Sequence, residues 1–169
     1  RKDLTAIIKS DISISYCDIS TKAYQLANSL SEKGIEKNTY VPLLIEHQLK
    51  FIETIIALWS LGVIPVPLNT KLLDDEINSN LNDYDFKFLV TDMEAVNKFK
   101  KLNLEIIDFN NISINNIEIN SFQLPALDEE AVVIFTSGST GRPKGVVHTF
   151  SSLINSIENG NHILNHKEN

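Results

Sequence analysis

Apolar side chains in the first part of the chain repeat with a helical period. Residues 16–30 carry apolar side chains that share one helix face: Ile19, Ala23, Leu26, Ala27 and Leu30. Gly34 follows at the position where a left-handed C-terminal cap belongs. The spacing therefore predicts a helix over 16–30. A second helix is predicted over 49–61, with four residues turned inward: Leu49, Ile52, Ile56 and Trp59.

Short apolar runs separate the helical segments and predict strands over 41–45, 63–66, 88–91 and 105–107. Pro42 has no N–H to donate, so the first strand is expected near a sheet edge or with an irregular start. Further helices are predicted over 74–81 and 94–102. Strands that alternate with helices at these lengths are typical of a parallel sheet. The predicted fold class is α/β, with a mostly parallel, helix-covered sheet.

The second half of the chain departs from this alternation. Residues 109–123 contain five asparagines and alternating isoleucines, which fit an edge hairpin or a polar loop; we favour a loop with some strand character. Residues 131–135 are strongly apolar and rich in β-branched side chains, which predicts a central strand. Residues 145–147 predict a returning strand, and a helix is expected to follow with Thr149 or Ser151 as its N-cap.

Composition narrows the classes of protein to consider. The chain has 169 residues, and 43% of them are hydrophobic, as in globular proteins. Its net charge is -7 and its basic residues form no stripe, so no nucleic-acid partner is expected. Its single cysteine, Cys17, excludes an internal disulfide and is a poor candidate for a catalytic thiol. The apolar region 51–68 contains Glu53, Pro65 and Pro67, which argues against a membrane span. A cytoplasmic protein is expected.

The segment 136–147 reads TSGSTGRPKGVV and carries the clearest chemistry. Within ten residues it places four hydroxyl side chains, three glycines and Lys144 directly after an apolar strand. Glycines let the backbone approach a ligand, and successive N–H groups, hydroxyls and an ammonium bind phosphate oxygens. A surface turn rarely combines so many of these residues. The segment therefore predicts a loop that holds the outer phosphates of a nucleoside triphosphate.

Two other phosphate loops do not fit this segment. The Walker pattern needs Lys directly after Gly, whereas Lys144 follows Pro143 and precedes Gly145. The dinucleotide pattern needs G-x-G-x-x-G, whereas the glycines here lie three and four residues apart.

The run TSGSTGRPKGVV resembles the phosphate-binding signature of adenylate-forming, or AMP-binding, enzymes, which include acyl-CoA synthetases, luciferases and peptide-synthetase adenylation domains. The segments 14–16, 41–46, 52–69 and 89–92 follow the order seen in that family. The resemblance implies that residues 1–169 are the N-terminal portion of an AMP-binding domain with the adenylate-forming fold. Later motifs of the family lie beyond residue 169, so we expect a piece of a larger enzyme that is inactive alone.

The resemblance also implies an activity. Members join a carboxylate to ATP, release pyrophosphate and pass the acyl group to coenzyme A or a carrier thiol. The residues implied to bind the β- and γ-phosphates are Thr136, Ser137, Gly138, Ser139, Thr140, Gly141 and Lys144. Mg²⁺ is expected as a helper, with no metal ligand in these residues and no catalytic residue beyond an electrostatic role for Lys144. Arg142 is expected to be solvated.

The acid substrate is less well defined. The run 146–150, VVHTF, resembles a pattern common in o-succinylbenzoate-CoA ligases of menaquinone synthesis, which we favour. A fatty-acyl-CoA ligase, a peptide-synthetase adenylation domain and a non-catalytic ATP-binding relative stay open. His148 lies where the family places its acyl pocket, so it either touches substrate or has a structural or solvated role.

Overall fold

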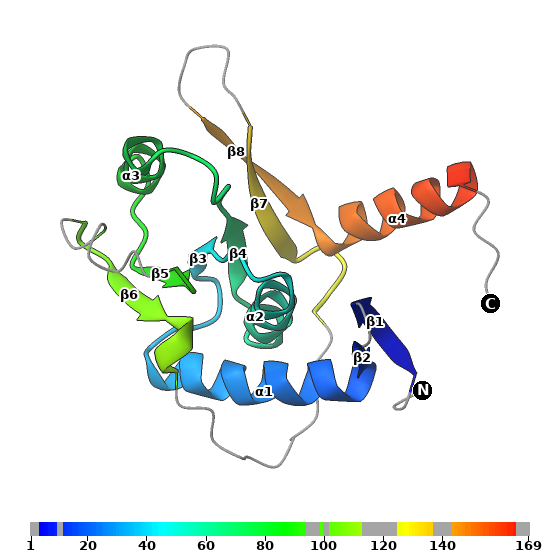
Figure 1. The fold of residues 1–169 in the computed structure, drawn as a ribbon. Coiled ribbons are helices and arrows are strands. Elements are labelled where there is room, and N and C mark those ends of the chain that lie inside the picture. The colour runs from blue at the N-terminus through cyan, green and yellow to red at the C-terminus, as the bar shows by residue number, and fades with distance from the viewer. Residues whose placement is uncertain are drawn as a thin grey trace.

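A computed structural model of the chain describes residues 4–9, 12–93, 99, 102–112, 125–136 and 143–164. Its centre is a four-stranded sheet formed by β3 (Tyr40–Leu44), β4 (Ile64–Pro67), β5 (Phe88–Thr91) and β6 (Glu105–Asp108). The strand order is β4-β3-β5-β6, and every pair is parallel. The predicted α/β fold with a mostly parallel sheet is confirmed (Figure 1).

Helices cover both faces of this sheet. The helices α1 (Tyr16–Glu32) and α2 (Gln48–Ser60) share one core cluster with Val41, Leu43 and Val90. The helix α3 (Asp74–Asn82) shares a second cluster with Leu44 and Leu89. Neighbouring residues along a strand point to opposite faces, so these two clusters lie on opposite sides of the sheet. The predictions of helices over 16–30, 49–61 and 74–81 are confirmed.

Of two finer predictions about these elements, one was confirmed and one was wrong. The strand β3 lies between β4 and β5, but its pairing with β5 begins only at Leu43, after Pro42, so it has the irregular start that was one of the two expected alternatives. The fully buried residues of α2 are Glu53, Thr54, Ala57 and Leu58, whereas the predicted inward residues are only partly buried. This helix packs on α1 as well as on the sheet and is apolar around much of its circumference, so apolar spacing did not identify its most buried face.

The N-terminal residues form a hairpin that the sequence pattern did not predict. The strands β1 (Thr5–Lys9) and β2 (Ile12–Ser15) pair antiparallel, and Ser15 then caps α1. The Ser15 hydroxyl accepts a hydrogen bond from the Asp18 N–H at 3.1 Å. Gly34, after α1, has φ +85°, which confirms the predicted left-handed position.

The C-terminal part forms a second antiparallel hairpin and a helix. The strands β7 (Glu130–Thr136) and β8 (Lys144–Thr149) pair with each other, and α4 (Phe150–Leu164) follows and projects away from the sheet (Figure 1). The returning strand is confirmed. The prediction that 131–135 is a central strand was wrong, because in the described part of the chain β7 pairs only with β8. Its apolar side chains pack beside β4, where Val133 meets Ile64 and Val66.

The predicted cap of the last helix is described by the structure, whereas most of the segments 109–123 and 94–102 is not. The Thr149 hydroxyl accepts a hydrogen bond from the Ser152 N–H at 3.2 Å, which confirms Thr149 as the cap of α4. The short 3-10 helix η2 (Phe109–Asn111) opens the segment 109–123, most of which lies outside the described residues. Most of the predicted helix over 94–102 also lies outside them.

Candidate functional site

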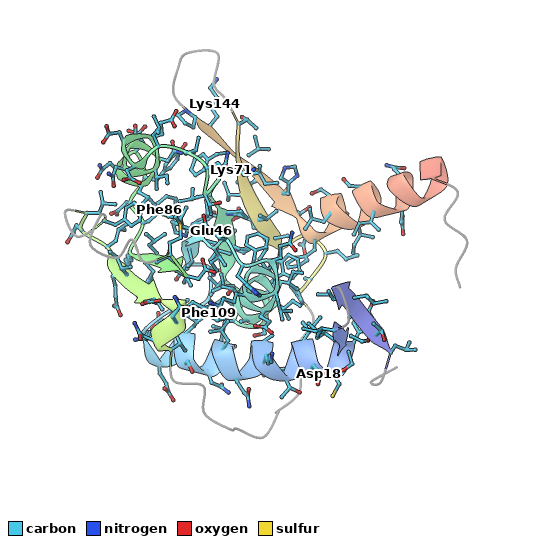
Figure 2. All side chains as sticks on the ribbon, viewed as in Figure 1. Asp18, Glu46, Lys71, Phe86, Phe109 and Lys144 are labelled. Carbon is cyan, nitrogen blue, oxygen red and sulfur yellow. The ribbon has the colours of Figure 1, made fainter. Side chains whose placement is uncertain are left out.

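The β7–β8 hairpin brings together two of the residues predicted to bind phosphate. Thr136 and Lys144 are opposite each other at the end of the ladder, and the Thr136 hydroxyl donates to the Lys144 carbonyl oxygen at 3.3 Å. Figure 2 shows Lys144 at the start of β8. The other predicted phosphate ligands (Ser137, Gly138, Ser139, Thr140 and Gly141) and Arg142 lie outside the described residues. The structure therefore defines both ends of the predicted loop.

Close packing inside the hairpin requires a glycine at position 145. A Cβ added to Gly145 would lie 2.9 Å from the Val133 Cγ1 atom, closer than such atoms approach in proteins. Val133 in turn packs against β4, so it has no room to move away. The third glycine of the motif therefore lets β8 lie over Val133 and does not act only as a flexible element.

An aromatic group supports the same end of the hairpin. The ring centroid of Tyr84, in the turn after α3, lies 5.2 Å from that of Phe135 and 5.7 Å from that of Phe86. The Tyr84 hydroxyl donates to the Pro143 carbonyl oxygen at 3.3 Å. Sequence reasoning missed Tyr84 and Phe86, because no motif or period connects them with residues near 140.

A cavity of about 800 Å³ lies beside Thr136. Its lining comes from the end of β7, the residue before β8, the loop after β4 and one face of α3: Ile134, Phe135, Thr136, Pro143, Pro67, Leu68, Asn69, Leu72, Glu76, Ser79 and Asn80. The cavity thus lies outside the carboxyl ends of β4 and β7. In open α/β sheets this is the edge where ligands bind.

The charge of Lys144 is available to a ligand. Its side chain is exposed, and no carboxylate in the described part of the chain forms an ion pair with it. Thr136 is also exposed. A hydroxyl and an ammonium group at neighbouring strand ends can together bind an anion.

The opposite end of the hairpin is held by polar contacts to the parallel sheet. Tyr40 donates a hydrogen bond to the Glu130 carboxylate, and this bond, followed by partial burial, raises the pKa of Tyr40 above its usual value. The Lys37 ammonium lies 2.9 Å from Glu129, and its hydrogen bond is the main cause that lowers the pKa of that carboxyl group. The base of the hairpin is therefore attached to the start of β3 and the turn before it.

His148 is not close to the predicted phosphate ligands. It is half-buried, pairs with Val132 in the ladder and is absent from the lining of the cavity beside Thr136. It follows Lys144 by four positions along an extended strand, or roughly 13 Å. The hairpin therefore does not bring His148 to the same anion as Lys144.

A metal site and a membrane-spanning helix were not found in the described ranges. No group of three or more His, Cys, Asp or Glu side chains there is arranged to hold a metal ion. Cys17 is exposed in the first turn of α1, away from the hairpin. Among the helices described, none is both long and apolar enough to cross a membrane.

The fold resembles those of solved adenylate-forming enzymes. The o-succinylbenzoate CoA synthetase from Bacillus subtilis, in complex with the acyl-adenylate intermediate OSB-AMP, superposes with a TM-score of 0.84 at 27% identity, covering 97% of this chain and 43% of that one. The same enzyme in complex with ATP and a magnesium ion gives a TM-score of 0.85 at 25% identity, covering 97% and 44%. The α/β fold of this chain is therefore that of the N-terminal domain of these structures.

Sequence comparisons agree with the structural ones. A 2-succinylbenzoate–CoA ligase from Bacillus mycoides (strain KBAB4) is 28% identical over 89% of this chain and 31% of its own length. Bacitracin synthase 1 from Bacillus licheniformis is 28% identical over 90% of this chain and 3% of its own length. The chain thus spans about a third of the length of the ligase. The family model described as AMP-binding enzyme matches residues 1–168, so this chain belongs to the AMP-binding enzyme family.

Proposed function

We propose that residues 1–169 are the N-terminal portion of an AMP-binding domain in an acid–CoA ligase. The enzyme activates a carboxylic acid with ATP through an acyl-adenylate and then forms a thioester with coenzyme A. The observation that carries the proposal is the placement of Thr136 and Lys144 at adjoining strand ends, beside a cavity at the ligand-binding edge of the fold. The family and the ligand-bound structures of relatives support the same chemistry.

In this proposal the hairpin binds the outer phosphates of ATP. The residues assigned to that role are Thr136, Ser137, Gly138, Ser139, Thr140, Gly141 and Lys144. Lys144 and the hydroxyls stabilise the charge that builds on the pyrophosphate as it leaves, because fixed donors need no rearrangement during the reaction. Arg142 is assigned to solvent.

The donor set of the hairpin fits an anion. The segment 136–147 offers hydroxyls, N–H groups and one ammonium, and it contains no carboxylate of the kind that Mg²⁺ prefers. We therefore expect Mg²⁺ to arrive with the phosphates and to neutralise part of their charge when bound. Coenzyme A supplies the thiol that accepts the acyl group.

The favoured acid is o-succinylbenzoate, which would place the enzyme in menaquinone biosynthesis. The run 146–150, VVHTF, and the 2-succinylbenzoate–CoA ligase among the relatives support this choice. Bacitracin synthase 1 matches over a similar share of the chain at the same identity, so a peptide-synthetase adenylation domain is the second candidate, ahead of a fatty-acyl-CoA ligase. A non-catalytic ATP-binding relative is the alternative that is not an enzyme. His148 is assigned to the acyl side of the site.

The enzyme is proposed to act in the cytoplasm on small molecules, without a nucleic-acid or membrane partner. The single cysteine, Cys17, which has no disulfide partner in the chain, and the acidic net charge of -7 support this assignment.

Carboxylate-dependent ATP–pyrophosphate exchange by the complete gene product tests the proposed function. The panel of acids contains o-succinylbenzoate, benzoates, fatty acids of several lengths and the amino acids. Exchange with one class establishes adenylation and identifies the substrate class. An absence of exchange across the panel, with ATP binding retained, would favour the non-catalytic relative.

The variant Lys144→Met tests the assigned residue. Loss of a donor to the developing charge is expected to lower the exchange rate by roughly 10²- to 10³-fold. The melting temperature should not change, because Lys144 is exposed and has no ion pair among the described residues. Lys33→Met, at the exposed C-cap of α1, is the matched control and should match the wild type. Equal rates for Lys144→Met and the control would exclude a role for Lys144.

A further inference from the structure

One hydroxyl group connects the turn after α3 with the hairpin that carries the proposed phosphate site. Tyr84 follows Asp83, the C-cap of α3, and its hydroxyl donates to the Pro143 carbonyl oxygen at 3.3 Å. The two residues are 59 positions apart in the chain. Pro143 directly precedes Lys144, so this hydrogen bond holds the backbone from which the Lys144 side chain extends.

The ring of the same tyrosine contacts the other arm of the hairpin. Its centroid lies 5.2 Å from that of Phe135, which directly precedes Thr136, and the two planes are tilted by 53°. The ring also meets Phe86, just before β5, and Phe86 packs in the core cluster of α3. Tyr84 thus contacts the residue before each of the two described phosphate ligands.

We propose that Tyr84 is a positioning residue, which holds Thr136 and Lys144 in place for binding the phosphates of ATP. The inference rests on the proposed function. A strand end that is already held by neighbouring contacts loses less conformational entropy when it binds a ligand. Donors that are held in place before the ligand arrives therefore bind it more tightly.

The exposure of Tyr84 separates this role from a contribution to the core. The residue is 39% exposed, whereas the core clusters are built from residues that are almost fully buried. Replacement by phenylalanine keeps the ring contacts and removes only the hydroxyl group. The variant Tyr84→Phe should therefore affect nucleotide binding much more than folding.

The test is ATP–pyrophosphate exchange by the complete gene product with Tyr84→Phe. The KM for ATP should rise roughly two- to tenfold, the range expected for one hydrogen bond, and nearer twofold because 3.3 Å is long for a bond between two oxygens. The KM for the acid and the melting temperature should not change. Tyr16→Phe, at an exposed tyrosine that starts α1, is the matched control. Tyr84→Ala, which also removes the ring, should raise the KM for ATP further.

Each outcome is decisive. If the wild type shows no exchange with any acid, the proposed function itself fails. If the wild type is active and Tyr84→Phe has the same KM for ATP as the Tyr16→Phe control, the positioning role is wrong. Equal increases in KM for ATP and for the acid, or a lower melting temperature alone, would also overturn it, because they indicate general loosening of the domain.

Discussion

Trp59 joins three elements of the structure, and its replacement tests how the hairpin is held. The indole Nε1–H of Trp59, near the end of α2, donates to the Ala131 carbonyl oxygen at 2.6 Å. Its ring also meets that of Phe150, the first residue of α4, edge to face at a centroid distance of 5.2 Å. The perturbation is Trp59→Phe, which keeps an aromatic ring and removes the N–H donor.

The size of the effect follows from the position of Ala131 in β7. The register of the hairpin shifts between Glu130 and Val132, so Ala131 has no residue opposite it in β8. Ala131 is fully buried, and in Trp59→Phe its carbonyl oxygen loses a donor that the ladder does not replace. A buried acceptor left without its partner costs about 1–3 kcal/mol. For a folding unit of roughly 150–250 residues, about 2 kcal/mol corresponds to a fall in melting temperature of roughly 4–8 °C, and the fall should be smaller in the complete domain, which is larger.

Urea and thermal unfolding of the complete gene product, followed by circular dichroism, measure this effect. The urea midpoint should fall while the slope of the transition stays the same, since the variant changes stability and not compactness. Phe150→Leu serves as a control, because it keeps the hydrogen bond and removes the edge-to-face ring pair, worth about 0.5–1.5 kcal/mol. A loss below about 0.5 kcal/mol in Trp59→Phe would refute the reasoning, because it would mean that the Ala131 carbonyl oxygen does not need this donor.

Two further predictions concern the base of the hairpin. Gly62 has φ +66°, and an added Cβ would lie 2.9 Å from the Lys37 Cγ atom. Gly34 has φ +85°, but nothing lies within 4 Å of its added Cβ. Gly62→Ala should therefore lose more stability in urea unfolding than Gly34→Ala. The strain common to both is about 1–2 kcal/mol, and equal losses would show that Lys37 moves aside freely. The raised pKa of Tyr40, caused mainly by its hydrogen bond to Glu130, contributes stability that is present below pH 10.0 and lost as the pH rises through the folded-state pKa. Above that pH, the urea midpoint of the wild type should therefore fall more steeply with increasing pH than that of Tyr40→Phe. The same dependence of the midpoint on pH in both proteins would contradict the assignment.

The elements that sequence reasoning predicted correctly are those encoded by local patterns. The helix α1 has an apolar face of period 3.6 and Gly34 after its end, and both signals lie within about twenty residues. The parallel strands were found because each is a short apolar run between such helices. Thr149 was one of the two predicted caps, for the same local reason.

The position of β7 was not encoded in this way. Its apolar residues were interpreted as a central strand of the parallel sheet, yet they are buried by packing beside β4 and against the aromatic group at Phe135. Apolar composition reports that a strand is buried and does not report which strand lies next to it. For Pro42 the sequence left open an edge strand or an irregular start, and the structure has the irregular start, because the missing N–H falls where the pairing of β3 with β5 has not yet begun.

In the candidate site, too, the residues within a local motif could be predicted and the residue from a distant element could not. The motif alone identified Thr136 and Lys144, and the structure places them together at the end of the hairpin. Tyr84 could not be predicted, since a tyrosine in the turn after α3 has no sequence pattern that relates it to Pro143, 59 residues later. Residues that support a site from another element are visible only when the fold is known.

The two ends of the hairpin are held by different contacts, and this difference separates folding from binding. At the base, Trp59 and Glu130 attach β7 to α2 and to β3, whereas at the end near the loop the attachment includes the Tyr84 hydroxyl and its ring contacts. If the hairpin is anchored mainly at its base, Trp59→Phe should lower the melting temperature and leave the KM for ATP unchanged well below that temperature. Tyr84→Phe should do the reverse. A rise in the KM for ATP in both variants would instead mean that the hairpin shifts as one rigid unit, with Lys144 positioned from both ends.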